Sequence, residues 1–414
     1  MKNRFGIIVL AAVAAASFTL VGCSSDSTNS TAPGKLVPAA AGLPEFYAVP
    51  DPMPEMSPGT IIKSQPVAVD GLDGTLSLVM YGSTSVTGQT IPVTGVIIIP
   101  NGIAPEGGWP VITWAHGTTG LADTCAPSLK PDEFVPLANP LLAKGYLIVA
   151  TDYEGLGVPG LHPYIVGDSE AYGTLDIVKA ARVFPGANAS SRFLIWGHSQ
   201  GGHAALFAGR DAEPYAPELD LVGVVAGAPP SQLLLINAAL QQSSYRHYFA
   251  MAAAGLNAAY GDTAAPLDQV LNPEGLDFLT KVDTLCSTDL VKAASTLDFS
   301  KLQKVDPATV PEWREILANN DPGTFATPIP VPLLIIHGGN DEQIPTASSA
   351  LLFTQLCAVG QVAQRWVFPG QSHAGVIAPS APAMLTWIDD RFAGKPMPDP
   401  VAPANAEKQS CGQS

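Results

Sequence analysis

The sequence predicts an α/β fold with a mostly parallel central sheet flanked by helices. Short apolar runs rich in β-branched residues recur along the chain, and they lack the polar alternation of a half-exposed strand, as expected for strands buried on both faces. Helix-like stretches alternate with the later runs, which is typical of a doubly wound sheet. The first runs follow one another without helices, so we expect them to pair as an antiparallel edge.

The elements can be assigned in chain order. The expected strands are 76–81, 93–100, 111–116, 146–151, 192–197, 221–226, 331–337 and 365–368. The expected core helices are 172–184, 200–210, 346–357 and 381–392.

The alternation stops between residues 228 and 330, where helical pieces over 231–242 and 245–259 are expected and no buried strand stands out. Two parallel neighbours in one sheet need only about a dozen residues between them. We therefore expect a helical cap, or lid, over the carboxyl ends of the strands, where the sites of α/β proteins lie. A separate domain is the alternative.

The first residues predict export. Lys2 and Arg4 precede an apolar run over residues 7–21, which is short for a membrane span and typical of a signal peptide. The run ends in Leu-Val-Gly before Cys23, a pattern that resembles a bacterial lipobox, in which the cysteine is lipidated and becomes the mature N-terminus. An ordinary secretory signal is the alternative. We expect an extracytoplasmic lipoprotein anchored to the cell envelope, since each buried lipid methylene contributes about 0.8 kcal/mol.

The domain organisation follows from these boundaries. We expect a lipoprotein signal peptide (1–22), a flexible tether rich in Ser, Thr, Ala and Pro (23–43), the N-terminal part of the core (44–227), the cap (228–330), and the C-terminal part of the core with a tail (331–414).

Composition and charge exclude some classes of protein. Hydrophobic residues make up 47% and charged residues 14% of the chain, which indicates a globular protein. The formal net charge of -16 disfavours a nucleic-acid partner, because an acidic surface repels phosphates. Four cysteines besides Cys23 suggest two disulfides in an exported chain, with free thiols as the alternative; these are Cys125, Cys286, Cys357 and Cys411. The chain has no Cys-x-x-Cys pair, so we expect no metal site.

A candidate nucleophile, Ser199, lies in the motif Gly-His-Ser-Gln-Gly over residues 197–201. The motif follows an expected strand and precedes an expected helix. Such a sharp turn strains the backbone at the nucleophile, and the flanking glycines leave room for it. The hydroxyl then stands clear of the sheet at a helix N-terminus, where negative charge is favoured. A tight turn with an incidental serine is the alternative.

A serine hydroxyl needs a base to take its proton and an acid to orient that base. In α/β-hydrolases the chain order is serine, acid, histidine. Asp341 follows the expected strand over 331–337 and is the candidate acid, with Glu342 as its neighbour and rival. His373 follows the last expected strand and is the only histidine beyond Asp341, so it is the candidate base. Two further histidines are expected to be structural; these are His203 and His337.

An acyl-transfer reaction also needs two backbone donors for the oxyanion. The amide of Gln200, directly after the nucleophile, is one candidate. The second is Thr118, in the loop His-Gly-Thr-Thr-Gly over residues 116–120, which follows an early expected strand. A glycine-rich turn without a catalytic role is the alternative for this loop.

These motifs, together with Asp-Tyr-Glu-Gly-Leu-Gly over residues 152–157 and the loop over 337–345, resemble the secretory lipase family. The resemblance extends roughly over residues 44–392. It implies an α/β-hydrolase fold with a helical cap, acyl-ester hydrolysis, and a triad that falls on Ser199, Asp341 and His373. It also implies the disulfide pairs Cys125–Cys286 and Cys357–Cys411. The lipobox departs from the plain secretory signal of the family, so an esterase is a more secure expectation than a lipase.

The sequence therefore predicts a serine carboxylic-ester hydrolase of the esterase or triacylglycerol lipase type. It would act through an acyl-enzyme on a small-molecule or lipid ester, as a monomer and without a cofactor or metal. A serine peptidase or an acyltransferase on the same fold remains an alternative. A non-catalytic binding protein is disfavoured, because every role in the triad has a well-placed residue.

Overall fold

The structure is a computed structural model that describes residues 35–397 and 403–412. The predicted signal peptide and the predicted lipidation site, Cys23, lie outside the described residues. Among the described helices, none combines the length and the apolar character needed to cross a membrane.

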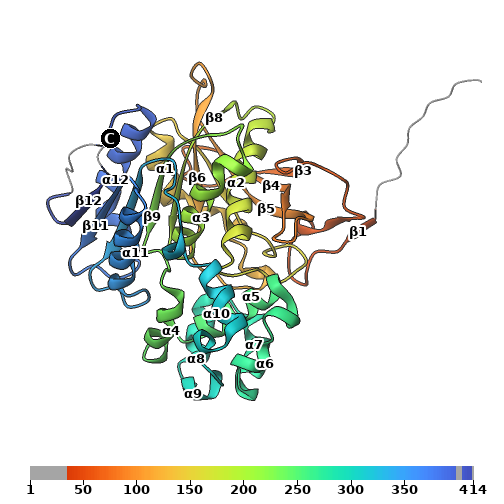
Figure 1. Cartoon of the computed structure of the whole chain (residues 1–414). Helices are drawn as coiled ribbons and strands as arrows, with labels where there is room; N and C mark the ends of the chain where they lie inside the picture. Colours follow the sequence, from red (N-terminus) through yellow and green to blue (C-terminus); the bar gives the residue numbers. More distant parts are fainter. Residues whose placement is uncertain (1–34, 398–402, 413–414) are drawn as a thin grey trace, which may run out of the picture. The chain divides into compact units, whose positions relative to one another are not determined.

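A ten-stranded sheet lies at the centre, in the order β12-β11-β10-β9-β8-β6-β7-β5-β4-β3 (Figure 1). The strands are β3 (Ile61–Val67), β4 (Gly74–Thr84), β5 (Thr90–Pro100), β6 (Trp109–Ala115), β7 (Leu147–Thr151), β8 (Ala189–His198), β9 (Asp220–Gly227), β10 (Leu333–Gly338), β11 (Ala363–Phe368) and β12 (Glu407–Cys411). Strands β7, β6, β8, β9, β10 and β11 are parallel, whereas β3, β4 and β5 form an antiparallel edge. The predicted α/β fold with its mostly parallel sheet is thereby confirmed.

The parallel strands are buried on both faces. In β8, Phe193 and Ile195 belong to one core cluster, and Leu194 and Trp196 belong to the other. Successive side chains of a strand point to opposite faces, so a strand between two helical layers needs an apolar residue at every position. This requirement explains the uninterrupted apolar runs in the sequence.

Helices cover both faces of the sheet. One face packs against α2 (Gly167–Val183), α3 (Gln200–Tyr215) and α11 (Thr346–Ala358). The other packs against α1 (Val135–Leu142) and α12 (Ile377–Phe392).

Residues 228–330 connect β9 to β10 and contain helices but no strand. They form α4 (Leu233–Gln241), α5 (His247–Ala264), α6 (Leu267–Val270), α7 (Pro273–Val282), α8 (Ser287–Ala294), α9 (Phe299–Leu302) and α10 (Pro311–Asn319). Figure 1 shows these helices gathered on one side of the sheet. Their apolar side chains form a cluster of their own, to which the core contributes Leu121, Tyr164, Ile165 and Val166.

Some strands were not indicated by the apolar pattern. The edge strand β12 has the polar sequence Glu-Lys-Gln-Ser-Cys and pairs antiparallel with β11. Strand β1 (Lys35–Val37) pairs antiparallel with β2 (Val49–Asp51), although β1 lies within the segment 23–43 that the sequence assigns to a flexible tether. Residues 35–37 are thus part of a regular strand pair.

Candidate active site

Ser199 lies at the turn from β8 to α3 in a strained conformation, with φ 60° and ψ -124°. Residues other than glycine rarely adopt a positive φ, and such strain occurs mostly at functional sites. The amide of Ser199 donates a hydrogen bond of 2.8 Å to the carbonyl oxygen of Gly227 at the end of β9. The strained turn is therefore fastened to the neighbouring strand.

The two glycines of the motif are required by close approaches of the backbone. A Cβ atom on Gly197 would lie 1.9 Å from the carbonyl oxygen of Gly201, and one on Gly201 would lie 1.8 Å from the carbonyl oxygen of Ala115. These contacts are far inside van der Waals distance, and the second obstacle is backbone of the central strand β6. Any side chain at either position would force the turn open.

The predicted acid and base meet in the structure. Nδ1 of His373, in the loop after β11, lies 2.7 Å from Oδ2 of Asp341, in the loop after β10. The other carboxylate oxygen, Oδ1, accepts the amides of Gln343 and Ile344 at 2.9 and 2.8 Å. Nε2 of His337 lies 3.1 Å from Oδ2, so this histidine supports the Asp341 loop as predicted.

These contacts keep Asp341 ionised. Burial alone would raise the pKa of this carboxyl, but the hydrogen bonds from His337 and His373 outweigh burial and hold its pKa well below the usual range. The rival acid, Glu342, makes a different contact: its Oε2 accepts the backbone amide of His373 at 3.1 Å. Asp341 alone of the two contacts the imidazole ring.

The remaining ring nitrogen of His373 takes part in none of these contacts. Nε2 is buried and has no hydrogen-bond partner among the described residues. His373 and Ser199 line the same open pocket, together with Thr118. His198 packs against His373 with ring centroids 4.8 Å apart, and burial lowers the pKa of His198 to about 3, so this neighbour is neutral.

The two predicted oxyanion donors lie near Ser199: Thr118 lines the same pocket, and Gln200 is the next residue of the chain. A Cβ atom built on Gly117 would lie 3.6 Å from the Cβ of Ser199, so the 116–120 loop packs directly against the nucleophile. The hydroxyl of Thr118 is hydrogen-bonded to that of Tyr164 at 2.9 Å. Within the described part of the chain, the amides of Thr118 and Gln200 donate to no other backbone or side chain.

A buried polar network behind the nucleophile was missed by the sequence reasoning. The side chain of Gln200 donates to Oε1 of Glu170 at 2.9 Å, and it lies 2.7 Å from Nε2 of His162. Oε2 of Glu170 lies 2.7 Å from Nδ1 of His203, and both side chains are fully buried. Burial lowers the pKa of His203, but the charge of Glu170 together with the hydrogen bonds to Glu170 and to the backbone of Asn320 outweighs burial and raises that pKa overall. His203 is structural, as predicted, while Glu170 carried no spacing signal within its helix.

The Asp-Tyr-Glu-Gly-Leu-Gly motif supports the 116–120 loop rather than lining the pocket. Asp152 is buried. Its carboxylate accepts hydrogen bonds from the hydroxyl of Thr94 at 2.7 Å, from the amide of Ser128 at 2.8 Å and from the hydroxyl of Ser128. The hydroxyl of Tyr153 donates to the carbonyl oxygen of His116 at 3.1 Å. The motif therefore fixes the loop that begins at His116.

A disulfide joins the oxyanion region to the helical insertion. Cys125 and Cys286 are bonded, one of the two pairs implied by the family resemblance. Next to it, Gly120 and Cys286 form an isolated antiparallel bridge, and the amide of Ser287 donates to the carbonyl oxygen of Thr119 at 2.7 Å. The start of α8 is thus attached to the 116–120 loop.

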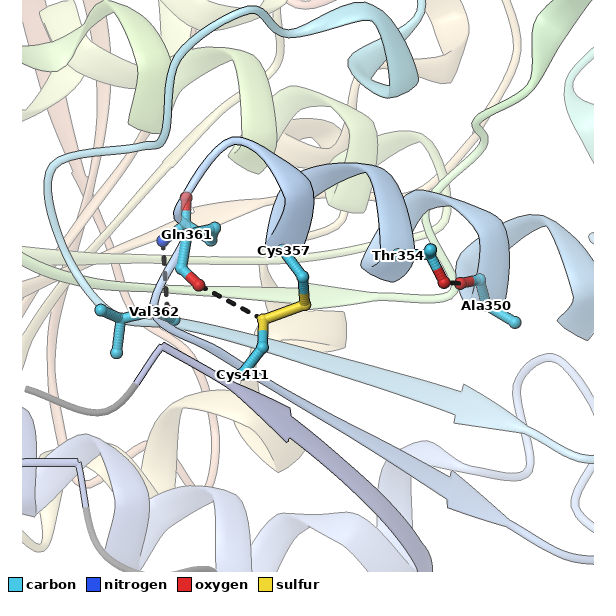
Figure 2. The surroundings of a disulfide bond; sticks show 6 residues. All are labelled: Ala350, Thr354, Cys357, Gln361, Val362 and Cys411. Carbon is cyan, nitrogen blue, oxygen red and sulfur yellow. Dashed lines mark hydrogen bonds between the residues drawn. A yellow bond between two sulfur atoms is a disulfide. The ribbon is translucent and has the colours of Figure 1, made fainter.

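A second disulfide fastens the C-terminal strand. Cys357, near the end of α11, is bonded to Cys411 of β12, the other pair implied by the resemblance (Figure 2). Figure 2 also shows Gln361, whose carbonyl oxygen lies 3.3 Å from the sulfur of Cys411. This bridge lies at the edge of the sheet and involves none of the residues around Ser199.

Two pockets meet at Ser199. The first has an empty volume of about 790 Å³ and extends between the helices of residues 228–330; apolar side chains dominate its lining, including Leu233, Phe249 and Leu256. The second is more open, and it contains His373 as well as Ser199. An apolar chamber on one side and a polar opening on the other suit an ester with a long acyl part.

No group of three or more potential metal ligands is found within residues 35–397 and 403–412.

Comparisons with known proteins show the family of this chain. The sequence profile of the secretory lipase family matches residues 133–399. A probable inactive lipase of Mycobacterium tuberculosis is 28% identical, with 86% of this chain and 83% of the relative covered. A secreted triacylglycerol lipase, LIP4, of Malassezia globosa is 26% identical, with 84% and 81% covered.

Solved structures show the same fold. Lipase A of Candida antarctica in its closed state superposes with a TM-score of 0.73 at 20% identity, covering 86% of each chain. The rice cell wall degrading esterase LipA from Xanthomonas oryzae gives a TM-score of 0.68 at 20% identity, covering 82% of this chain and 97% of the esterase. The fold is that of the α/β-hydrolases, and this chain belongs to the secretory lipase family of carboxylic ester hydrolases.

Proposed function

We propose that this chain hydrolyses carboxylic esters, with acylglycerols or similar lipid esters as substrates, through a triad of Ser199, Asp341 and His373. The observation that carries the proposal is the hydrogen bond of 2.7 Å between Nδ1 of His373 and Oδ2 of Asp341. It leaves Nε2 of His373 without a partner among the described residues, in the pocket that Ser199 also lines.

The reaction follows from this arrangement. Nε2 of His373 takes the proton of the Ser199 hydroxyl as its oxygen attacks the ester carbonyl carbon. The low pKa of Asp341 keeps its carboxylate ionised, so it stabilises the imidazolium that forms. The tetrahedral intermediate expels the alcohol, which takes the proton from His373, and an acyl-enzyme remains. Water then attacks the acyl-enzyme by the same route and releases the carboxylic acid.

The oxyanion is stabilised by the amides of Thr118 and Gln200. Both amides lack an acceptor in the described part of the chain; Gln200 directly follows Ser199, and Thr118 lines the same pocket as Ser199. Removing one such donor typically lowers kcat by ~10²–10³-fold. The dipole of α3, which begins directly after Ser199, favours the same charge.

A relative that is named a probable inactive lipase makes turnover the first question for this chain. We expect the purified protein to hydrolyse a series of p-nitrophenyl esters from acetate to palmitate, and Ser199→Ala to abolish this turnover. A fluorophosphonate probe should label the wild type and not the variant. Folded wild-type protein that neither turns over any ester nor reacts with the probe would refute the proposal.

We further propose that residues 228–330 act as a cap over the acyl-binding chamber. Most of the lining of the apolar pocket comes from this segment, and the disulfide Cys125–Cys286 attaches it to the oxyanion loop. The chain-length optimum of the ester series tests this role. Activity confined to the shortest esters would contradict an acyl chamber under the cap.

The chain is proposed to be exported and held at the membrane through a lipid on Cys23. Two disulfides fit an oxidising compartment outside the cytoplasm, and relatives of the chain are named secreted lipases. Metabolic labelling with an alkyne fatty acid should mark the wild type, and Cys23→Ala should remove the label. A labelled Cys23→Ala variant would refute the anchor.

A further inference from the structure

The apolar chamber next to Ser199 contains polar groups that lack a partner. Asn237 of α4 lines it and is 7% exposed, and neither its Nδ2 nor its Oδ1 has a hydrogen-bond partner among the described residues. Trp313 of α10 also lines the chamber, and its buried Nε1 likewise has no described partner. A buried polar group left without a partner destabilises the folded state. Two such groups in one otherwise apolar chamber call for a ligand that pairs with them.

The two groups come from adjacent helices, because α4 and α10 pack against each other. Together they offer N–H donors on Asn237 and Trp313 and one carbonyl acceptor on Asn237. A plain methylene chain can pair with none of these atoms. A carbonyl group of a ligand would use a donor but leave Oδ1 of Asn237 unpaired. A hydroxyl group can donate to Oδ1 and accept from an N–H at the same time.

We propose that this chamber selects acyl chains that carry a hydroxyl group, so that the preferred substrates are esters of hydroxy fatty acids. The inference rests on the proposed function, because Ser199 at one end of the chamber would hold the acyl carbon. The chamber's apolar wall accommodates the methylenes, and Asn237 with Trp313 pairs with the hydroxyl. Hydrolysis itself proceeds as for an unsubstituted ester.

The test measures kcat/KM for p-nitrophenyl palmitate and for a set of p-nitrophenyl hydroxypalmitates. Each member of the set carries its hydroxyl on a different carbon of the acyl chain. We expect at least about a tenfold preference for one position or two neighbouring ones, since a site built to bind a hydroxyl disfavours the analogue that lacks it. Asn237→Leu should abolish this preference. It should also raise turnover of the plain palmitate ester, because the methylenes of the acyl chain then no longer pack against an unpaired amide.

Tryptophan variants provide the matched control and remain useful if Asn237→Leu fails to fold. Trp313→Phe removes the N–H donor together with part of the indole ring and should lower the preference. Trp387 also has a buried Nε1 without a described hydrogen-bond partner, but it belongs to α12, lies in a core cluster of the sheet and does not line the chamber. Trp387→Phe should therefore leave the preference unchanged.

The outcomes separate this inference from the proposed function. Hydrolysis of plain palmitate by Ser199 with no preference at any hydroxyl position would overturn the hydroxyl site and leave the ester hydrolase intact. A preference that survives both Asn237→Leu and Trp313→Phe would also overturn it. Absence of turnover on every ester would overturn both.

Discussion

The carboxylate of Glu170 holds the side chain of Gln200 in place, because Nε2 of Gln200 lies 2.9 Å from Oε1 of Glu170. The backbone amide of Gln200 is one of the two proposed oxyanion donors. The second oxygen of Glu170 lies 2.7 Å from His203, one turn further along α3. A single buried carboxylate on α2 thus fixes the first turn of the helix that carries the oxyanion amide.

Glu170→Ala is expected to lower kcat by about 10–100-fold with little change in KM, since outer-shell partners of this kind orient reacting groups without touching substrate. It should also lower the free energy of unfolding by about 3–5 kcal/mol, because His203 loses its buried partner. Glu170→Gln retains an acceptor for Gln200 and should recover most of kcat. Steady-state kinetics and urea unfolding measure both effects. A Glu170→Gln variant as inactive as Glu170→Ala would argue against a positioning role.

The two adjacent acids give an internal control for the triad. Asp341→Asn is expected to lower kcat by ~10⁴-fold, because the amide no longer stabilises the imidazolium of His373. Glu342→Gln should lower kcat less than about tenfold, since its carbonyl oxygen can still accept the amide of His373. Rates with p-nitrophenyl butyrate measure both. The reverse order would reassign the acid to Glu342.

The two disulfides should differ in their effect on activity. Cys411→Ser is expected to lower the free energy of unfolding by about 2–4 kcal/mol, because β12 is no longer tied to α11, while kcat changes little. Cys286→Ser should lower kcat as well, because Cys286 adjoins the 116–120 loop through its bridge with Gly120. Thermal unfolding and ester kinetics distinguish the two variants. Equal kinetic effects would show that the bridge near the site has no special role.

The elements that could be predicted from the sequence are those whose pattern lies within one short stretch of residues. The buried stretches of β6 and β8 are mostly apolar because both faces are covered, and the glycines at 197 and 201 mark a turn that admits no side chain. The order of acid and base along the chain then predicted Asp341 and His373, whose side chains the structure brings together at 2.7 Å.

The remaining features depend on contacts between distant segments. Glu170 looks like any charged residue of a helix, and only the fold places His203 and Gln200 against it. The polar strand β12 has no apolar pattern, and its place at the sheet edge is set by pairing with β11 and by the Cys357 bridge. The unpartnered amide of Asn237 becomes visible only when α4 closes the chamber with its neighbours.

Asp152 should make stability depend on pH. Burial raises the pKa of its carboxyl from an ordinary value of 3.8 to about 6. The folded state then binds the proton more tightly than the unfolded state, so the free energy of unfolding falls as pH rises through this window. The fall amounts to about 1.4 kcal/mol per unit of the pKa difference, or about 3 kcal/mol in all.

Asp152→Asn cannot titrate and is expected to flatten this slope, although the loss of one acceptor for Ser128 or Thr94 lowers stability at every pH. Urea unfolding of both proteins at several pH values between 3.8 and 6 measures the difference in slope. Parallel curves for wild type and variant would mean that another buried acid, such as Asp123, whose pKa burial also raises to about 6, controls the dependence.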